Sequence, residues 1–452
     1  MEPVDVVLLY EHVARELDVL CAVKYLCETR HRLRVEIVQQ PYGVAAALQR
    51  FEPRIVALPF CYSDSLTDYP LLLDWPKATY VNLAWEELFY NGNREAKLPK
   101  GEFASQHVLH HAWGDFFAEL LRERGVPQRN IFVNGQPAFM LYQSPYRDYF
   151  PTRLELARKH GLDPARRWIF FPENYNWAFY APWKLDSFEH DGLRRDHMEA
   201  MVRFCRDSLT TALEWCAKLA ATQQVEIVIR PRPSVPLEEF QTFAAGVISE
   251  SPAALHYTKT ESVREWILAS QVVLSSYSTS LIESAVAGKD TYIVEPYPIP
   301  VVLQTDWQAY LFHLTTAEAF ETACLQSAPA SGGDLNTWTR ARLLAHGDPI
   351  DRLAQMLSDL RRGGMPRPPH FQPGSVLPSG QSSRLARREF EHLRRAGHTA
   401  RRTPNPIVSP LYENDFVSRD EIDWRVQRWG QVLGSQVRPP APTRVLTWGG
   451  PR

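Results

Sequence analysis

The sequence lacks any apolar run long enough to cross a bilayer, and its first apolar run covers only residues 6–10, after Glu2 and Asp5. It also lacks an excess of one charge, since 50 Lys and Arg residues stand against 52 Asp and Glu residues. This balance argues against nucleic-acid binding by the whole surface. The six cysteines form no Cys-x-x-Cys pair and are expected to be reduced and buried. These absences predict a cytoplasmic protein without a nucleic-acid partner.

Several motifs that carry catalysis are also absent. The sequence contains no Walker loop, Gly-x-Gly-x-x-Gly, His-Glu-x-x-His or Gly-x-Ser-x-Gly, which argues against the common nucleotidases, dehydrogenases, metalloproteases and serine hydrolases. His107, His110 and His111 lie close together in the sequence. The segment 106–113 resembles a strand, however, so His110 and His111 point to opposite faces, and no Cys or acidic residue stands at ligand spacing. We therefore predict no metal and no cofactor.

Strand-like runs alternate with helix-like segments over residues 4–300, and the pattern restarts after residue 150. Such alternation is typical of parallel sheets flanked by helices. We predict an α/β protein with two Rossmann-like, doubly wound domains that face each other across a cleft. The predicted units are an acceptor-side domain at 1–150, a nucleotide-donor domain at 151–325, and a helical and loop-rich, Arg-rich extension at 326–452 that ends in a packed helix.

The stretch 271–288 is the most informative, because a buried strand runs there directly into a helix. Five hydroxylated residues stand between them, namely Ser275, Ser276, Ser278, Thr279 and Ser280. A helix start has unpaired N–H groups and a partial positive charge, so it suits a phosphate. An ordinary Ser/Thr helix cap is the alternative. The density of hydroxyls, and a second candidate anion site upstream, favour a ligand.

That second candidate is Arg230-Pro-Arg232-Pro, which directly follows the strand predicted at 225–229. Two guanidinium groups there suit a pyrophosphate, although a solvated turn is the alternative. Another strand, at 168–171, leads into a loop over 172–191 that is rich in aromatic residues. Aromatic faces suit sugar rings or bases and Asn174 suits a hydroxyl, whereas the alternative is that these aromatics fill a domain interface.

Glu86 and Glu87 follow the strand predicted at 79–84, in the N-terminal domain. Paired carboxylates can divide acid and base work because each raises the pKa of the other. A solvated acidic turn is the alternative interpretation. Near the other end, the segment 382–396 resembles a helix that carries five arginines. It suits contact with anionic lipid headgroups or a phosphorylated acceptor, while a helix bound to the protein's own acidic surface is the alternative.

Four short stretches resemble bacterial surface carbohydrate biosynthesis proteins, which are GT-B type glycosyltransferases related to capsule, lipopolysaccharide and CDP-glycerol transferases. The stretches are Val7-Leu-Leu-Tyr with Arg15-Glu-Leu-Asp18, Trp113-Gly114 with Val133-Asn-Gly-Gln-Pro137, the segment 275–288, and Tyr412-Glu-Asn-Asp-Phe with Trp429. In related transferases a His-Pro pair and a Ser/Thr cluster bind the nucleotide phosphates. The hydroxyl cluster at 275–280 matches the second feature, and Arg232-Pro233 stands in place of the first.

The resemblance implies a metal-independent glycosyltransferase of surface polysaccharide biosynthesis that uses a nucleotide-activated donor, CMP- or CDP-linked. Its acceptor would be a glycan or lipid-linked glycan. The protein would be located in the cytoplasm or at the inner-membrane surface. The catalytic base of such enzymes is an acidic residue of the N-terminal domain, to which Glu86 and Glu87 are the nearest matches. Glu283 is assigned to the donor ribose. A nucleotide-sugar 2-epimerase of the same fold and a non-catalytic glycan- or nucleotide-binding scaffold remain as alternatives.

Overall fold

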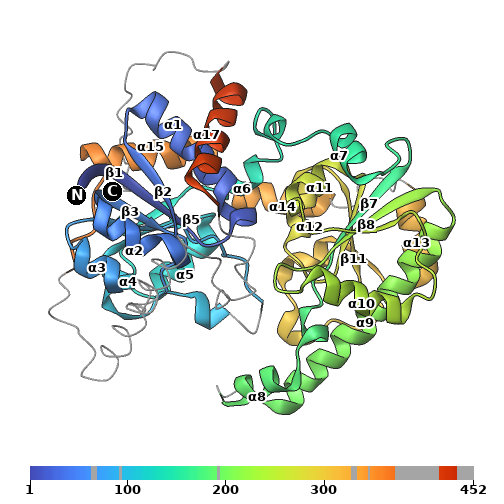
Figure 1. Ribbon diagram of the computed structural model, residues 1–452. Helices are drawn as coiled ribbons and strands as arrows, with labels where there is room; N and C mark the ends of the chain where they lie inside the picture. The colour runs from blue at the N-terminus through green and yellow to red at the C-terminus, as the bar shows by residue number, and fades with distance from the viewer. Residues whose placement is uncertain are drawn as a thin grey trace.

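The structure, a computed structural model, describes residues 1–62, 69–90, 94–190, 194–326, 333–344, 347–371 and 417–434. These residues form two α/β domains, each built around a six-stranded sheet (Figure 1). Every neighbouring pair of strands in the two sheets is parallel. The prediction of two Rossmann-like, doubly wound domains is confirmed.

The first sheet has the strand order β2-β1-β3-β4-β5-β6. Its strand β1 (Glu2–Tyr10) is fully buried from Val6 to Tyr10, as expected for an apolar run with a helix layer on each side. The other strands are β2 (Val35–Gln39), β3 (Phe51–Leu58), β4 (Thr79–Asn82), β5 (Val108–Ala112) and β6 (Ile131–Val133). The helices of this domain are α1 (Asp18–His31), α2 (Gln40–Arg50), α3 (Tyr69–Asp74), α4 (Gly101–Gln106), α5 (Asp115–Glu123) and α6 (Pro137–Met140).

The second sheet has the strand order β12-β11-β10-β7-β8-β9. Its strands are β7 (Arg167–Pro172), β8 (Val225–Arg230), β9 (Leu255–Tyr257), β10 (Val272–Ser275), β11 (Asp290–Val294) and β12 (Phe312–Leu314). Strands β10, β7 and β8 are neighbours, so the segments that follow them emerge side by side at one edge. This order brings together the three segments in which the sequence analysis placed the donor site.

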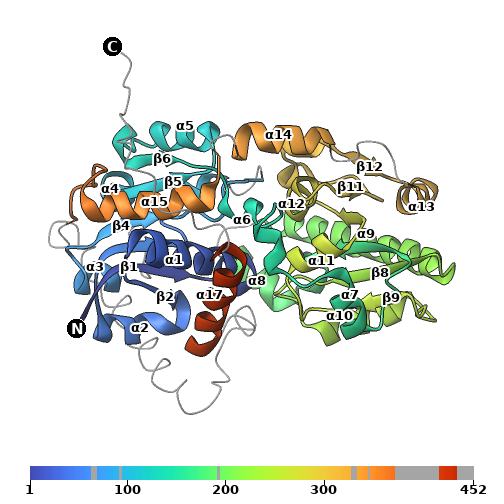
Figure 2. The same ribbon diagram turned by 90° about the horizontal axis from the view of Figure 1, so that it is seen from above.

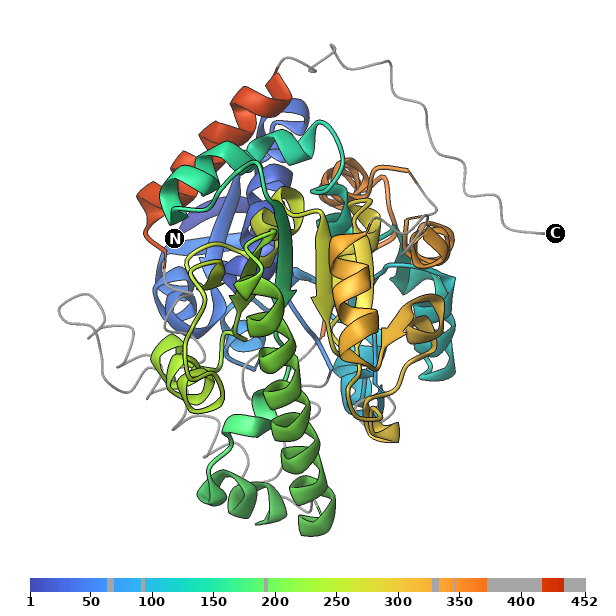
Figure 3. The same cartoon turned by 90° about the vertical axis from the view of Figure 1, so that its right-hand side faces the viewer.

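The helices of the second domain include one long member, α9 (Arg195–Ala221), which extends well past the sheet in Figure 3. The others are α7 (Arg153–His160), α8 (Pro182–His190), α10 (Leu237–Val247), α11 (Val263–Ala269), α12 (Ser280–Val286), α13 (Ala317–Leu325) and α14 (Gly333–Leu343). Within the described residues, no helix combines the length and the apolar character that a membrane span needs.

After α14 the chain returns to the first domain. Helix α14 packs on α12, whereas α15 (Pro349–Arg362) and α17 (Arg419–Leu433) both pack on α1 (Figure 2). The hydroxyl of Ser418 accepts a hydrogen bond from the backbone N–H of Glu421 at 3.2 Å and caps α17, the packed helix predicted near the end of the sequence. Helices α14 and α15 were not predicted from the sequence. The basic helix predicted at 382–396 lies outside the described residues.

Two glycines allow a close approach of the backbone where α14 ends. A Cβ built on Gly114 would lie 1.8 Å from the carbonyl oxygen of Arg342, so only glycine fits there. Gly135 has a φ of +110°, and the next residue, Gln136, donates its backbone N–H to the carbonyl of Leu343 at 2.8 Å. The stretches around Trp113-Gly114 and Gly135, which carry part of the family resemblance, therefore hold the crossing chain in place.

Candidate functional site

A cleft of about 470 Å³ lies between the two domains. Ligands of open parallel sheets bind beyond the carboxyl ends of the strands, and segments that follow β1, β8 and β9 line this cleft. The size suits a small-molecule site. The residues that line it include His12, Arg15, Asp18, Glu86, Tyr149, Arg230, Arg232, Glu261, Trp424, Arg425 and Arg428.

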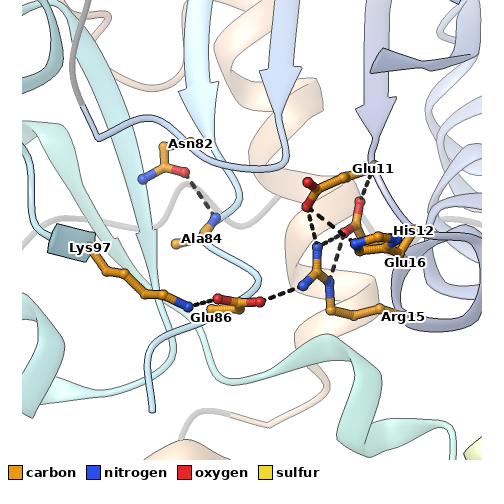
Figure 4. A network of polar contacts seen from close by, with 8 residues as sticks. All are labelled: Glu11, His12, Arg15, Glu16, Asn82, Ala84, Glu86 and Lys97. Atoms are coloured by element: carbon orange, nitrogen blue, oxygen red, sulfur yellow. Dashed lines mark hydrogen bonds and ion pairs between the residues drawn. The ribbon is translucent and has the colours of Figure 1, made fainter. Parts of the chain in front are cut away.

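A network centred on Arg15 forms the wall from the first domain (Figure 4). Arg15 lies in a π-helical turn, η1 (Val13–Leu17), a local geometry frequent at functional sites. Its guanidinium donates to Glu11 at 2.8 Å, to Glu16 at 2.5 Å and to Glu86 at 2.6 Å. Burial raises the pKa of Glu16, while Arg15 opposes that rise. The three carboxylates fix the Arg15 side chain in the cleft.

Glu86 also forms an ion pair with Lys97, which lies in the short helix η2 (Arg94–Lys97). Burial lowers the pKa of Lys97 to about 8, and the nearby charges of Arg15 and Arg232 act in the same direction. Arg15 and Lys97 therefore fix the position of the Glu86 side chain at the cleft. A carboxylate in this position can accept a proton from a hydroxyl bound beside it.

Glu87 does not accompany Glu86 into the cleft. It is 3% exposed and accepts the backbone N–H of Trp113 at 2.7 Å, within the first domain. Burial raises the pKa of Glu87 well above its usual range. The structure thus separates the two carboxylates that the sequence analysis paired, with Glu86 at the cleft and Glu87 buried inside the first domain.

The arginines after β8 form the wall from the second domain. Arg230 is 8% exposed and donates its Nε to the carbonyl of Glu261 at 2.8 Å, and burial lowers its pKa to about 10. Arg232 donates to the side-chain oxygen of Asn174 at 2.6 Å and to that of Asn176 at 3.4 Å. In the described part of the chain, no carboxylate lies within 4.0 Å of either guanidinium. Two positive charges without carboxylate partners in a cleft make a site for an anion.

The hydroxyl-rich turn after β10 lies beside this site but does not line the cleft. Ser275 and Ser276 are fully buried, and the Ser275 hydroxyl donates to the carbonyl of Pro172 at 2.5 Å. Ser280 donates to Ser278 at 2.8 Å. Thr279 stands at the helix start without making a side-chain cap. The structure therefore brings Arg230, Arg232 and Asn174 together, whereas of the five hydroxyls only those of Ser278 and Ser280 bond to each other within the turn.

Glu283 lies on α12 and accepts a hydrogen bond from the Tyr142 hydroxyl. Tyr142 comes from the segment that joins the two domains, so Glu283 contributes to the contact between them. Tyr90 of the first domain likewise donates its hydroxyl to the backbone carbonyl of Tyr277 at 2.8 Å, and the two rings meet edge to face. The turn after β10 is thus held by aromatic residues from across the domain boundary.

Glu173, which precedes Asn174, is expected to make the stability of the folded protein depend on pH. Burial raises its pKa to about 7, against the backbone N–H of Tyr175 and the charge of Arg232, which lower it. A folded-state pKa above the unfolded value means that stability falls as the pH rises from about 4.5 to about 7 and then levels off.

We expect the Glu173→Gln variant to lack this pH-dependent loss of stability, which is on the order of 3 kcal/mol in the wild type. Urea unfolding at pH 5 and pH 8 measures it, with the exposed Glu119→Gln as control. A variant that follows the wild-type pH profile would refute the assignment.

Several residues at the cleft or beside it were not predicted from the sequence. His12 follows β1 directly, and its Nε2 lies 3.8 Å from a carboxylate oxygen of Glu11. Lys97 comes from a segment that no motif marked. Arg425 and Arg428 come from α17, which was predicted as a packed helix without any role for its charged residues. The available signal was the position of His12 and Arg15 at the carboxyl end of the first predicted strand.

No protein-family model and no curated protein matches the sequence. Among solved structures, a UDP-N-acetylglucosamine 2-epimerase is similar with a TM-score of 0.50 and 12% identity, over 82% of this chain and 100% of that one. The wall teichoic acid polymerase TagF is similar with a TM-score of 0.50 and 10% identity, over 79% of this chain and 88% of that one. At such identities the likeness concerns the fold. The chain therefore has the GT-B fold, with two Rossmann-like domains that meet at a cleft.

Proposed function

We propose that this protein is a glycosyltransferase, or a glycerophosphotransferase, that uses a nucleotide-activated donor in bacterial surface polysaccharide biosynthesis. The observation that carries the proposal is the pair Arg230 and Arg232, which face the interdomain cleft and, among the described residues, form no ion pair with a carboxylate within 4.0 Å. In this proposal, the anion that binds to Arg230 and Arg232 in the interdomain cleft is a nucleoside diphosphate or monophosphate. The two solved relatives are named for UDP-N-acetylglucosamine epimerisation and for teichoic acid polymerisation, and both chemistries fit the fold.

In the proposed mechanism, the arginines neutralise the charge that develops on the leaving phosphate. Asn174 orients Arg232 and bonds a donor hydroxyl, while Ser278 and Thr279, the two hydroxyl residues of the turn after β10 that are not buried, supply further donors to the phosphates. Glu283 bonds the donor ribose after the Tyr142 contact opens. Because protein cations do this work, the proposal needs no metal ion.

Glu86 acts in this proposal as the base that deprotonates the acceptor hydroxyl. It is the member of the predicted pair that lines the cleft, and Arg15 and Lys97 hold its side chain in place. The acceptor is a glycan or lipid-linked glycan, and the basic segment 382–396 would hold the protein near the inner-membrane surface from the cytoplasmic side. Glu87 takes no part in the chemistry.

Product analysis tests the reaction. With CMP-, CDP-, UDP- and GDP-linked donors, a transferase consumes donor only when an acceptor glycan is present. We expect Glu86→Gln to slow transfer by about 10²-fold or more, because positioned bases contribute factors of this size. Glu87→Gln is the matched control and should keep the wild-type rate, since its side chain lies outside the cleft.

Two other outcomes would replace the proposal. Conversion of the donor's sugar without any acceptor would identify a nucleotide-sugar 2-epimerase, the alternative that the fold supports equally. Donor binding without turnover under any of these conditions would identify a non-catalytic binding protein.

A further inference from the structure

The C-terminal helix α17 contributes to the cleft although most of the chain separates it from α1. It lies beside α1 near the junction of the two domains (Figure 2), and Trp424, Arg425 and Arg428 line the cavity. Its attachment to the first domain depends on other residues, because Trp429 and Leu433 are the buried side chains of the helix. Trp424 and Arg428 thus face the cleft without being part of the buried contact that holds the helix, whereas Arg425 both lines the cleft and pairs with Asp18 of α1.

The two arginines of α17 differ in their partners. Arg425 donates to Asp18 at 2.6 Å and to Glu421 at 2.7 Å, so two carboxylates compensate its charge. Arg428 instead lies over the ring of Tyr149, 4.8 Å from its centroid, and 5.5 Å from the centroid of Trp424. Across the described ranges, no carboxylate lies within 4.0 Å of the Arg428 guanidinium. Arg428 therefore brings a positive charge to the cavity wall that an anion can neutralise.

Trp424 is the aromatic side chain next to that charge. It precedes Arg428 by four residues, which puts both on one helix face. Its side chain is 51% exposed, although α17 buries Trp429 completely a turn away. An exposed indole that borders a cavity suits the apolar face of a sugar ring, and a guanidinium beside it suits a carboxylate or phosphate on that ring.

We infer that Trp424 and Arg428, with Tyr149 beneath the guanidinium, form a subsite for an anionic glycan, a sugar ring that carries a carboxylate or a phosphate. The role of this subsite rests on the proposed function: it holds the acceptor, while Arg230 and Arg232 hold the donor in the same cavity. The acceptor hydroxyl then meets the donor between the two domains, near Glu86 and Arg15. The acceptor is therefore an acidic glycan, and α17 contributes to its recognition.

Binding of defined oligosaccharides to the full chain tests the subsite without any donor. Isothermal titration with a hyaluronan tetrasaccharide probes the carboxylate, pentamannosyl phosphate probes the phosphate, and maltotetraose is the neutral control. We expect at least one of the anionic glycans to bind, more weakly at higher salt, and maltotetraose to bind at least tenfold more weakly. Trp424→Ala and Arg428→Ala should each lower the affinity for the anionic glycan by about tenfold or more, and Trp424→Phe should restore part of it.

Gln427→Ala is the matched control, because Gln427 is exposed on the same helix outside the cavity lining. It should bind like the wild type. Thermal stabilisation by nucleotides should be the same in Trp424→Ala and Arg428→Ala as in the wild type. The glycan assay contains no nucleotide, so a loss of glycan binding in these variants identifies the subsite whether or not a nucleotide binds. Failure of both anionic glycans to bind, equal binding of maltotetraose, or wild-type affinity in both variants would overturn the inference.

Discussion

Replacing Trp429 with alanine is expected to lower the free energy of unfolding by about 3–5 kcal/mol. The Trp429 side chain is fully buried and stacks on Tyr149, with ring centroids 4.1 Å apart and an interplanar angle of 10°. Its Nε1 donates to the backbone carbonyl of Asp18 at 2.9 Å. Alanine would leave a cavity between α17 and α1 and remove the hydrogen bond, so the helix would lose its main attachment.

Urea unfolding followed by circular dichroism measures this loss, and limited proteolysis shows whether α17 detaches. Trp424→Ala is the matched control, since that tryptophan lies on the same helix but is 51% exposed. Its effect should stay within about 0.5 kcal/mol, the range usual for surface substitutions. Equal losses in the two variants would show that α17 is not held by Trp429.

Asp18→Ala is expected to have an effect of similar size. Asp18 is the shared partner of Arg264 of the second domain, at 3.3 Å, and of Arg425 of α17, at 2.6 Å. Asp18 and Arg264 are almost completely buried, so removing the carboxylate leaves a buried guanidinium uncompensated. Breaking a buried pair in this way costs about 3–5 kcal/mol.

The same carboxylate joins α1, α11 and α17, so Asp18→Ala should also weaken the contact between the two domains. Glu421→Ala is the matched control, because Glu421 pairs with the same Arg425 but is 40% exposed. Exposed pairs contribute at most about 1 kcal/mol. Thermal and urea unfolding compare the two. A loss in Glu421→Ala as large as that in Asp18→Ala would contradict the role given to the buried pair.

The fold was largely predictable because its sheets are parallel. Strands such as β1 and β8 are buried on both faces, so they stand out in the sequence as short apolar runs between amphipathic helices. Helix α15 was missed although it carries a cap at Asp348, a proline at its start and Gly363 after its end. The segments around these signals are rich in loop-forming residues, which obscured them. The helix is also stabilised by packing on α1, which is more than 300 residues away in the sequence.

The candidate site was predictable only in part. The sequence places Asn174 and Arg232 each just after a strand. The strand order β10-β7-β8, which only the structure gives, brings them together because neighbouring parallel strands end at one edge. The sequence could not show that Glu87 turns inward to the N–H of Trp113, or that the Ser275 hydroxyl bonds to Pro172. The position of α17 at the cleft could not be predicted from the sequence either, because it depends on the packing of Trp429 against residues far away in the chain.

Thermal stabilisation by nucleotides tests most directly whether the cleft holds an activated donor. At 100 times its dissociation constant, a ligand stabilises the folded protein by about 2.7 kcal/mol. We predict that at least one of CMP, CDP, UDP, GDP or their sugars raises the melting temperature of the wild type. Arg232→Ala should weaken binding about 10- to 100-fold, as expected for the loss of a charged hydrogen-bond donor, and the exposed Arg158→Ala should bind normally. No stabilisation by any of these ligands, or equal stabilisation of Arg232→Ala, would contradict the account.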